Sequence, residues 1–418
     1  MTTEREMNLV VPQEGLVDVP AGPEEAEVYH QRAASGMELE DVQTEEMLIN
    51  MGPQHPATHG VLRIVLRTDG EVVLEAVPHL GYLHRCAEKI GENVSYVQYV
   101  PYTDRMDYVA GMNENWAFCR AVEKLGDIEV PRRAEFIRVI VGELQRIASH
   151  LVTFGTYGMD IGAFTPFLYA FREREYILDL FEMVCGARLT YSFFTIGGVT
   201  HDLPTGYLDK VDEFLDYFEP KIKEYNDLLS YNQIFIKRTA NVGILTPEMA
   251  IDYACTGPII RGSGLNYDLR RDKPYSVYPE LDFEVCVGSG EQGTLGDSWD
   301  RYIVRMREME QSCRIVRQCI KMIPEASDNP ETGGRHRAKI PRNFKPAAGE
   351  VYVETENPRG VLGFYVESQG GTLPYRVKAR AGTFCNLSAL GALCHNVLIA
   401  DMPAIIGSID IVMGQVDR

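Results

Sequence analysis

A long helical pattern in the middle of the chain constrains the fold more than any other feature. Pro131 suits the first position of a helix, where the N–H group that proline lacks would have no partner. After it, apolar residues recur every three or four positions, a spacing that places them on one helix face. They are Phe136, Ile137, Ile140, Leu144, Ile147 and Leu151. We expect a long helix with this face in the core, ended by a glycine-containing loop at 156–162.

Other helices are expected on both sides of this one. Thr103 and Asp104 can cap a helix that carries Asp107 and Tyr108 in its first turns. The segment 255–296 is rich in glycine and tyrosine and is expected to form turns. Three later segments combine helical spacing with residues that start or stop helices: 165–186, about 206–230 and 297–322.

Strand patterns occur near both ends of the chain. Two apolar segments, 61–67 and 71–77, flank Asp69-Gly70, a pair that readily takes the positive φ angles of a tight hairpin turn. Three strands separated by turns are expected near the C-terminus: 350–354, 361–367 and 375–379. The order of hairpin, helices and strand meander predicts an α+β fold that is mostly helical, with a central helix bundle and a small antiparallel β-sheet at one end.

Composition and pattern together divide the chain into four segments. The first 48 residues contain 12 acidic and 2 basic residues, so they carry −10 of the chain's net charge of −19. Such a segment buries little apolar surface, and we expect a mobile or partner-bound extension there. The predicted segments are the acidic extension 1–46, the hairpin with its preceding loop 47–85, the helical bundle 86–345, and the C-terminal meander and tail 346–418.

Charge and cysteine usage exclude several functions. The body of the chain is mildly acidic and has no cluster of lysine and arginine, which argues against nucleic-acid binding. The longest apolar run, 397–413, is broken by Asp401 and Asp410, so it is too short to span a membrane. The nine cysteines form no Cys-x-x-Cys pair. This favours a reducing compartment and argues against a disulfide framework, a zinc site or an iron–sulfur site within this chain.

A short loop with two histidines, 52–60, stands directly before the hairpin. Prolines restrict the backbone on both sides of His55, and glycines relax it at both ends, so the loop has a defined shape. One interpretation is structural, with both histidines bonded to backbone groups. The other places His59 in a site with Tyr108 and Asp160, where an ionised carboxylate favours the protonated imidazole. The site would then hold two proton donors.

Two other kinds of site lack support in the sequence. A metal site needs three or four ligands, and Pro56 prevents the two histidines from sharing a helix face. The glycine-containing segments 262–264 and 287–290 lack the lysine and the strand-to-helix context of phosphate-binding loops. No metal site or nucleotide site is therefore predicted in this chain.

Several motifs resemble those of a known family. From about Met47 to Arg418 the chain is similar to the D-subunit family of the proton-pumping NADH:quinone oxidoreductase, respiratory complex I, which is related to the large subunits of nickel–iron hydrogenases. The motifs are Gly52–Arg63, Pro78–Arg85, Asp104–Tyr108, Arg172–Glu175, Gly197–Val199, Pro374–Arg376 and Met413–Arg418. The resemblance implies that such a chain forms, with the B subunit of the complex, the site where electrons from the terminal iron–sulfur cluster reduce quinone, coupled to proton translocation.

The resemblance also implies roles for individual residues. His59 and Tyr108 match the ligands of the quinone headgroup, and Asp160 matches the carboxylate paired with that histidine. Arg85 and Arg105 match arginines near the iron–sulfur cluster, which the B subunit carries. The residues expected in the quinone pocket or its loop are His55, Thr156, Phe167, Leu168 and Val412.

Two further positions are compared with relatives. The second metal-binding Cys-x-x-Cys pair of hydrogenases falls here on Val412 and Gln415, so the resemblance implies that the metal site is lost. Thr190 stands where many relatives carry a histidine close to the cluster. This favours a cluster of lower potential and menaquinone as the substrate.

Cofactors, partners and location follow from the same resemblance. Quinone, either menaquinone or ubiquinone, is the expected substrate, no cofactor is bound covalently, and NADH and the iron–sulfur cluster belong to partner subunits. The expected partners are the B and C subunits, other peripheral-arm subunits and a membrane-arm subunit at the quinone entrance, on the cytoplasmic face of the bacterial inner membrane. Two alternatives remain: the equivalent subunit of a related complex with a different electron donor, and a non-catalytic hydrogenase-like scaffold subunit.

Overall fold

The computed structural model describes residues 46–327, 334–341 and 343–418. The predicted acidic extension falls almost entirely on residues 1–45 and lies outside the described residues. Residues 46–418 form one compact unit. The division of this unit at 85/86 and 345/346 stays a prediction.

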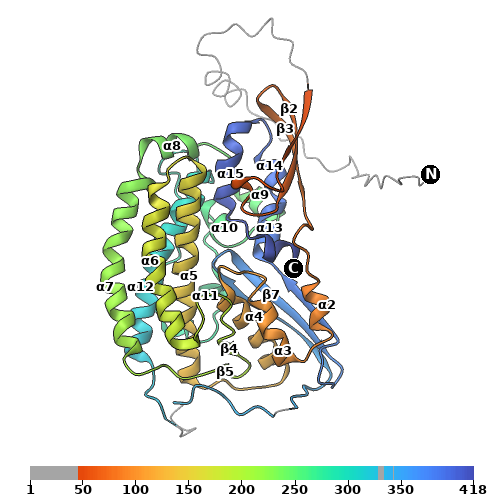
Figure 1. Cartoon of the computed structure of the whole chain (residues 1–418), viewed down its shortest axis with the longest axis vertical. Coiled ribbons are helices and arrows are strands. Elements are labelled where there is room, and N and C mark those ends of the chain that lie inside the picture. Colours follow the sequence, from red (N-terminus) through yellow and green to blue (C-terminus); the bar gives the residue numbers. More distant parts are fainter. Residues whose placement is uncertain (1–45, 328–333, 342) are drawn as a thin grey trace, which may run out of the picture. The chain divides into compact units, whose positions relative to one another are not determined.

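Long antiparallel helices form the bundle, with the longest, α5 (Arg132–Asp160), in contact with two others. Figure 1 shows α5 beside α6, with α7 at the outer edge and α12 behind them. All six apolar residues predicted to face the core from α5 are fully buried, so this helix prediction is confirmed. The other long helices are α6 (Thr165–Cys185), α7 (Tyr207–Tyr225), which continues as a π-helical turn Asn226–Ser230, and α12 (Ser298–Met322).

The ends of these helices have local causes. Gly186 stops α6 by taking a left-handed conformation with φ of 72°, which costs glycine little. Asp297 precedes α12, and its carboxylate accepts the N–H of Asp300 at 2.9 Å. The sequence prediction was correct at both positions.

Two predicted helix boundaries were wrong. The segment 156–160 is the last turn of α5 rather than a loop, because Gly158 packs against Leu229 and Pro166 instead of breaking the helix. The other error is the helix predicted to start at Thr103. The chain instead leaves α3 (Tyr96–Thr103) into a turn at 104–110, and α4 (Gly111–Leu125) starts after it.

The strands form two main sheets. In one, β1 (Glu46–Met51), β2 (Arg63–Asp69), β3 (Val72–His79) and β9 (Val397–Leu398) lie in the order β1-β2-β3-β9. In the other, β6 (Gly349–Asn357), β7 (Gly360–Ser368) and β8 (Arg376–Arg380) form a meander against which α4 packs. All of these pairs are antiparallel. The predicted α+β class is confirmed, although the hairpin and the meander belong to separate sheets (Figure 1).

The hairpin turn differs from the prediction by one residue. Asp69 pairs with Val72, so the turn residues are Gly70 and Glu71 rather than Asp69 and Gly70. Gly70 alone of these has a positive φ, of 58°. The aspartate remains in the strand because the glycine by itself supplies the left-handed position.

Short elements connect the bundle and the sheets. The 3-10 turns are η2 (Pro56–Thr58), η4 (Tyr278–Glu280) and η6 (Ile399–Asp401), and Phe194–Thr195 pairs with Gly198–Val199 as β4 and β5. None of the described helices is long and apolar enough to cross a membrane. The short helices are α2 (Ala87–Gly91), α8 (Gln233–Thr239), α9 (Pro247–Asp252), α10 (Pro258–Gly262), α11 (Leu269–Asp272), α13 (Gly382–Ser388), α14 (Leu390–Leu393), α15 (Met402–Ile409) and α16 (Met413–Asp417).

The C-terminal tail is buried and holds distant segments together. The carboxylate of Asp417 accepts the N–H groups of Gly81 and Leu83, at 2.9 and 2.7 Å. Gly414 lies so close to the 104–110 turn that a Cβ atom there would be 2.7 Å from the carbonyl oxygen of Met106. Because Gly414 has no side chain, the tail can pack directly against this turn. The tail thereby connects the turn to residues 81–83, which follow the hairpin.

Candidate functional site

The histidine loop is a short 3-10 turn with two differently placed rings. The Nδ1 atom of His55 accepts the N–H of Ala57 at 3.2 Å, and the hydroxyl of Thr58 donates to the carbonyl oxygen of His55 at 2.7 Å. His59 ends the turn in a left-handed conformation with φ of 48°. The exposed His55 therefore shapes the turn. The left-handed backbone of His59 directs its ring out of the turn, toward the end of α5.

The ring of His59 meets the carboxylate at the end of α5. Its Nε2 atom lies 2.5 Å from Oδ2 of Asp160, and the two side chains are only 12% and 5% exposed. In α15, the absence of a side chain at Gly407 leaves this carboxylate room, since a Cβ there would be 3.2 Å from Oδ2. The contact joins residues 101 positions apart. It fixes the orientation of the imidazole ring.

Tyr108 lies in the 104–110 turn, which two aspartates hold in place. Asp104 accepts both the N–H and the hydroxyl of Ser192, each at 2.8 Å. Asp107 accepts the N–H groups of Val109 and Ala110, each at 3.1 Å. These bonds explain why the segment is not helical, because Asp107 satisfies N–H groups that a helix would use and Ser192 holds Asp104 from a distant part of the chain.

The surroundings of Tyr108 keep its hydroxyl protonated. Burial raises the pKa of Tyr108, and the neighbouring Asp107 carboxylate raises it further, while Arg359 and Arg85 act in the opposite direction. The side chain is only partly exposed. Its phenol is consequently a neutral proton donor near pH 7.

Arg359 joins Tyr108's turn to the bundle and to the tail. Its guanidinium donates to Asp107 at 2.9 Å, to Asp410 at 3.4 Å and to the hydroxyl of Ser149 on α5 at 3.1 Å. The sequence prediction missed Arg359 and Asp410 as site residues. Two features of the sequence could have identified them. Arg359 lies in a Pro-Arg-Gly turn between two predicted strands, and Asp410 interrupts an apolar run.

Arg85 and Arg105 are brought together at the surface. The guanidinium of Arg85 donates to the carbonyl oxygen of Arg105, and that of Arg105 donates to the carbonyl oxygen of Pro101, both at 2.5 Å. Both arginines are exposed. Their positive charge is available at this surface.

The other predicted pocket residues lie near the ends of α5 and α6 and in the tail. The hydroxyl of Thr156 donates to the carbonyl oxygen of Val152 at 2.9 Å, one turn before Asp160. On α6, Phe167 is half-buried and Leu168 is 55% exposed. Val412 is buried. The next tail residue, Met413, lies against Gly60, where a Cβ would be 3.5 Å from its Cγ.

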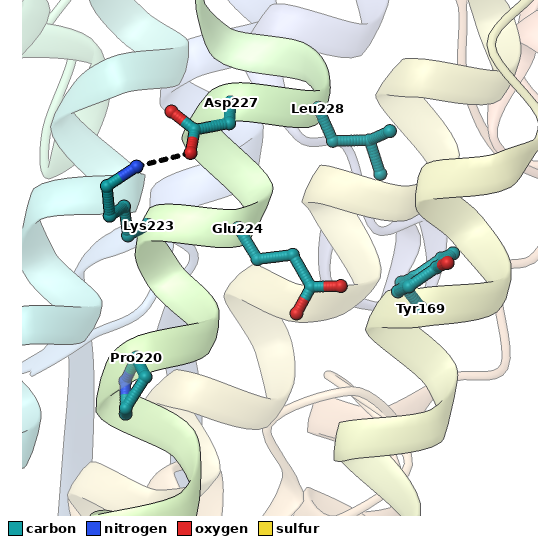
Figure 2. Close-up of a pocket in the computed structure, with 6 residues that line it drawn as sticks. All are labelled: Tyr169, Pro220, Lys223, Glu224, Asp227 and Leu228. Atoms are coloured by element: carbon teal, nitrogen blue, oxygen red, sulfur yellow. Dashed lines mark hydrogen bonds and ion pairs between the residues drawn. The ribbon is translucent and has the colours of Figure 1, made fainter.

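Two surface hollows lie away from these residues. Figure 2 shows one of them between α6 and the end of α7, with Lys223 and Asp227 paired beside it. The other is lined by Arg120, Lys124 and Lys273 beside β6. Neither hollow includes His59, Tyr108 or Asp160. The residues drawn in Figure 2 are Tyr169, Pro220, Lys223, Glu224, Asp227 and Leu228.

The described part of the chain has no cluster of three or more His, Cys, Asp or Glu side chains placed to hold a metal ion. At the positions that match the hydrogenase cysteines, Val412 is apolar and Gln415 is engaged in hydrogen bonds. Its Oε1 atom accepts from Thr383, and its Nε2 atom donates to Glu114 at 2.6 Å. These side chains pack the tail.

The helix bundle, the small antiparallel sheets and the buried tail beside a histidine–carboxylate pair agree with the hydrogenase-large-subunit type that the sequence motifs predicted. The model of the family "Respiratory-chain NADH dehydrogenase, 49 Kd subunit" matches residues 160–418. The chain belongs to this family, as the sequence motifs predicted.

Curated relatives support the same assignment over most of the chain. The D subunit of the NADH-quinone oxidoreductase of Chlorobium luteolum is 57% identical over 379 residues, which cover 90% of this chain and 95% of that protein. Its counterpart in Chlorobaculum tepidum is 56% identical over 379 residues, covering 90% and 94%. The predicted enzyme class, one subunit of a multi-subunit NADH:quinone oxidoreductase, is confirmed.

Proposed function

We propose that this chain forms, together with the B subunit, the site where quinone is reduced in the oxidoreductase, and that this reduction is coupled to proton translocation. The contact between His59 and Asp160 carries the proposal, because a mostly buried imidazole held at 2.5 Å by a carboxylate is suited to proton transfer. Electrons arrive from the iron–sulfur cluster of the B subunit. The quinone is menaquinone or ubiquinone, and Thr190 favours menaquinone.

Reduction of a quinone takes two electrons and two protons, one proton at each carbonyl oxygen. When both ring nitrogens of His59 are protonated, Asp160 holds the Nε2 proton and the Nδ1 proton is available to one quinone oxygen. The phenol of Tyr108 donates to the other oxygen. After the transfer, the imidazole is neutral and Tyr108 is a phenolate. Hydrogen bonds from both groups stabilise negative charge on the oxygens as electrons arrive.

Other residues of the chain complete the site. Thr156, Phe167, Leu168 and Val412 form part of the pocket wall, and His55 supports the loop. Arg85 and Arg105 place positive charge toward the B subunit, where it stabilises electrons on the partner's cluster. The C subunit, other peripheral-arm subunits and a membrane-arm subunit at the quinone entrance are further partners. The assembly lies on the cytoplasmic face of the bacterial inner membrane.

Substitution of the two proton donors tests the proposal. In the purified assembly, Tyr108→Phe and His59→Ala should each lower quinone reductase activity about 100-fold or more, the range expected for a lost general acid. Electron transfer from the donor to an artificial acceptor should be unchanged, because that route does not need quinone protonation. The measurement is steady-state turnover with each acceptor.

Exposed residues of the same types supply the controls. Tyr176→Phe and His201→Ala remove the same groups from the surface and should leave both activities unchanged. Normal quinone reductase activity in the Tyr108 and His59 variants would favour a non-catalytic scaffold subunit. Identification of the electron donor and the partner chains of the purified assembly distinguishes this enzyme from a related complex with a different donor.

A further inference from the structure

Glu114 differs from every other buried carboxylate in the part of the chain that the structure describes. The others accept a hydrogen bond or ion pair from a basic side chain or a backbone N–H group. Glu123, on the same helix, pairs with Arg138 at 2.5 Å. Within the described residues, Glu114 instead accepts only from the neutral amide of Gln415, at 2.6 Å.

The position of Glu114 makes a negative charge there costly. The residue lies in the first turn of α4 and is completely buried, and its Oε2 atom has no hydrogen-bond partner among residues 46–327, 334–341 and 343–418. An unpaired carboxylate without solvent is strongly disfavoured, and such a group stays protonated instead. Burial and then the Asp107 carboxylate raise the pKa of Glu114 well above its ordinary range, and Asp104 adds to this effect. Gln415 and Arg359 oppose it only in part.

Glu114 and Tyr108 share their surroundings. After burial, Asp107 is the largest influence on the pKa of both residues, and Arg359 acts on both in the opposite direction. Gln415 lies in α16 next to Gly414, which packs against the backbone of the turn that carries Tyr108. A carboxylic acid held in its neutral form therefore lies six positions along the chain from the phenol, and Asp107 and Arg359 act on both groups.

We propose that Glu114 stores the proton that returns Tyr108 to its phenol form after each quinone reduction. The proposal rests on the function proposed above, in which Tyr108 gives its proton to a quinone oxygen and becomes a phenolate. The O–H bond of the Glu114 carboxylic acid then breaks, and the proton forms the O–H bond of Tyr108. Glu114 becomes a carboxylate and later takes up a proton from water. No electron moves in these steps.

The direction of this transfer follows from acid strength. Burial and the Asp107 carboxylate raise the pKa of both groups, and the phenol starts from the higher ordinary value, so the proton moves from Glu114 to the phenolate. The neutral state of Tyr108 is restored before the buried carboxylate is reprotonated. A purely structural role would need only a neutral side chain of this size that accepts from Gln415. Glutamine meets that requirement, which makes Glu114→Gln the decisive variant.

The experiment uses the assembled oxidoreductase with Glu114→Gln and, as a matched control, Glu213→Gln on the exposed face of α7. We expect Glu114→Gln to lower quinone reductase activity at least about 10-fold, with unchanged electron transfer to an artificial acceptor. Redox-difference infrared spectra should lose a carbonyl band of a protonated carboxylic acid. Glu213→Gln should match the unmodified assembly in all three measurements.

The outcomes separate this proposal from the one on which it rests. Wild-type quinone turnover and an unchanged infrared difference spectrum in Glu114→Gln would overturn the storage role. If Tyr108→Phe is inactive in the same assay, the proposed function survives that result. Glu114→Asp keeps a titratable acid, so it should retain the band at a shifted frequency and more activity than Glu114→Gln. If Glu114→Gln fails to assemble, an absent or unshifted band in Glu114→Asp overturns the proposal.

Discussion

Two histidines four residues apart have different positions because of one backbone angle. His55 is extended and its ring accepts a hydrogen bond from its own loop, whereas His59 has a φ of 48° and its ring reaches α5. The sequence motif contains both residues without showing this difference. In the proposed mechanism, only the second histidine transfers a proton.

The pH dependence of the 104–110 turn is a test at the residue scale. Burial raises the pKa of Asp104 to about 6, from an ordinary 3.8, although Ser192 opposes the shift. Because the folded pKa is the higher one, the aspartate's contribution to stability is present below about pH 4 and is lost as the pH rises through 6. The loss is about 3 kcal/mol, at about 1.4 kcal/mol per pKa unit.

Hydrogen exchange measures this effect in the intact assembly. After correction for intrinsic exchange rates, the opening free energy of the turn should fall between pH 4 and pH 7. In Asp104→Asn it should change little over that interval, because asparagine does not titrate but can still accept from Ser192. The same pH dependence in the variant and the unmodified protein would show that another group controls the turn.

At the scale of elements, the contact between α5 and α15 determines where Asp160 lies. Gly407 on α15 faces Tyr157 and Asp160 at the end of α5, and a Cβ atom would be 2.5 Å from Cδ2 of Tyr157. The same helix, α5, carries Ser149, which binds Arg359. One helix thus supports both the His59 pair and the cluster around Tyr108.

Gly407→Ala should disturb the quinone site through this packing. The added methyl group forces the two helices apart at a cost of about 1 to 3 kcal/mol. The resulting shift of Asp160 should lower quinone reductase activity about 10-fold or more, because proton transfer depends on donor position. Gly371→Ala is the control, since its nearest neighbour would be 3.7 Å away. Equal, wild-type turnover in both variants would contradict this role for the contact.

At the scale of the whole molecule, a buried ion network joins the bundle to the C-terminal meander. Glu308 on α12 pairs with Arg261 at 2.8 Å and with His150 on α5 at 2.9 Å, and Arg261 also pairs with Glu356 on β6 at 2.9 Å. Burial alone would raise the pKa of Glu308, but Arg261 and His150 lower it below its ordinary range. The network connects elements that come from distant parts of the chain.

Glu308→Gln should destabilise the protein without a specific effect on quinone chemistry. Removal of the charge leaves Arg261 with Glu356 and Asp268 as its buried acidic partners, and replacing a charged hydrogen-bond acceptor by a neutral one costs about 1 to 3 kcal/mol. We expect less assembled oxidoreductase and a parallel loss of activity with quinone and with an artificial acceptor. Glu310→Gln changes an exposed residue of the same helix and should have no effect. A selective loss of quinone reduction in Glu308→Gln would instead place Glu308 in the proton chemistry.

The positions of most helices and strands could be predicted from local sequence, and the errors have a common physical cause. Periodic apolar residues and capping residues correctly placed α5, α6, α12 and the strands of the meander. The errors at 104–110 and 156–160 arose where distant residues decide the local structure. Ser192 holds Asp104 in a turn, and Leu229 packs on Gly158 in a helix. Neither partner can be identified from local spacing.

The sequence by itself determined most of the helices and strands, the family motifs and the residue types at the candidate site, because period, capping and turn preferences act over a few residues. Only the tertiary structure decided which of those residues meet. His59 contacts Asp160 across 101 positions, and Glu114 contacts Gln415 across 301. Such contacts depend on how helices and the buried tail pack, and packing is a property of the whole folded chain.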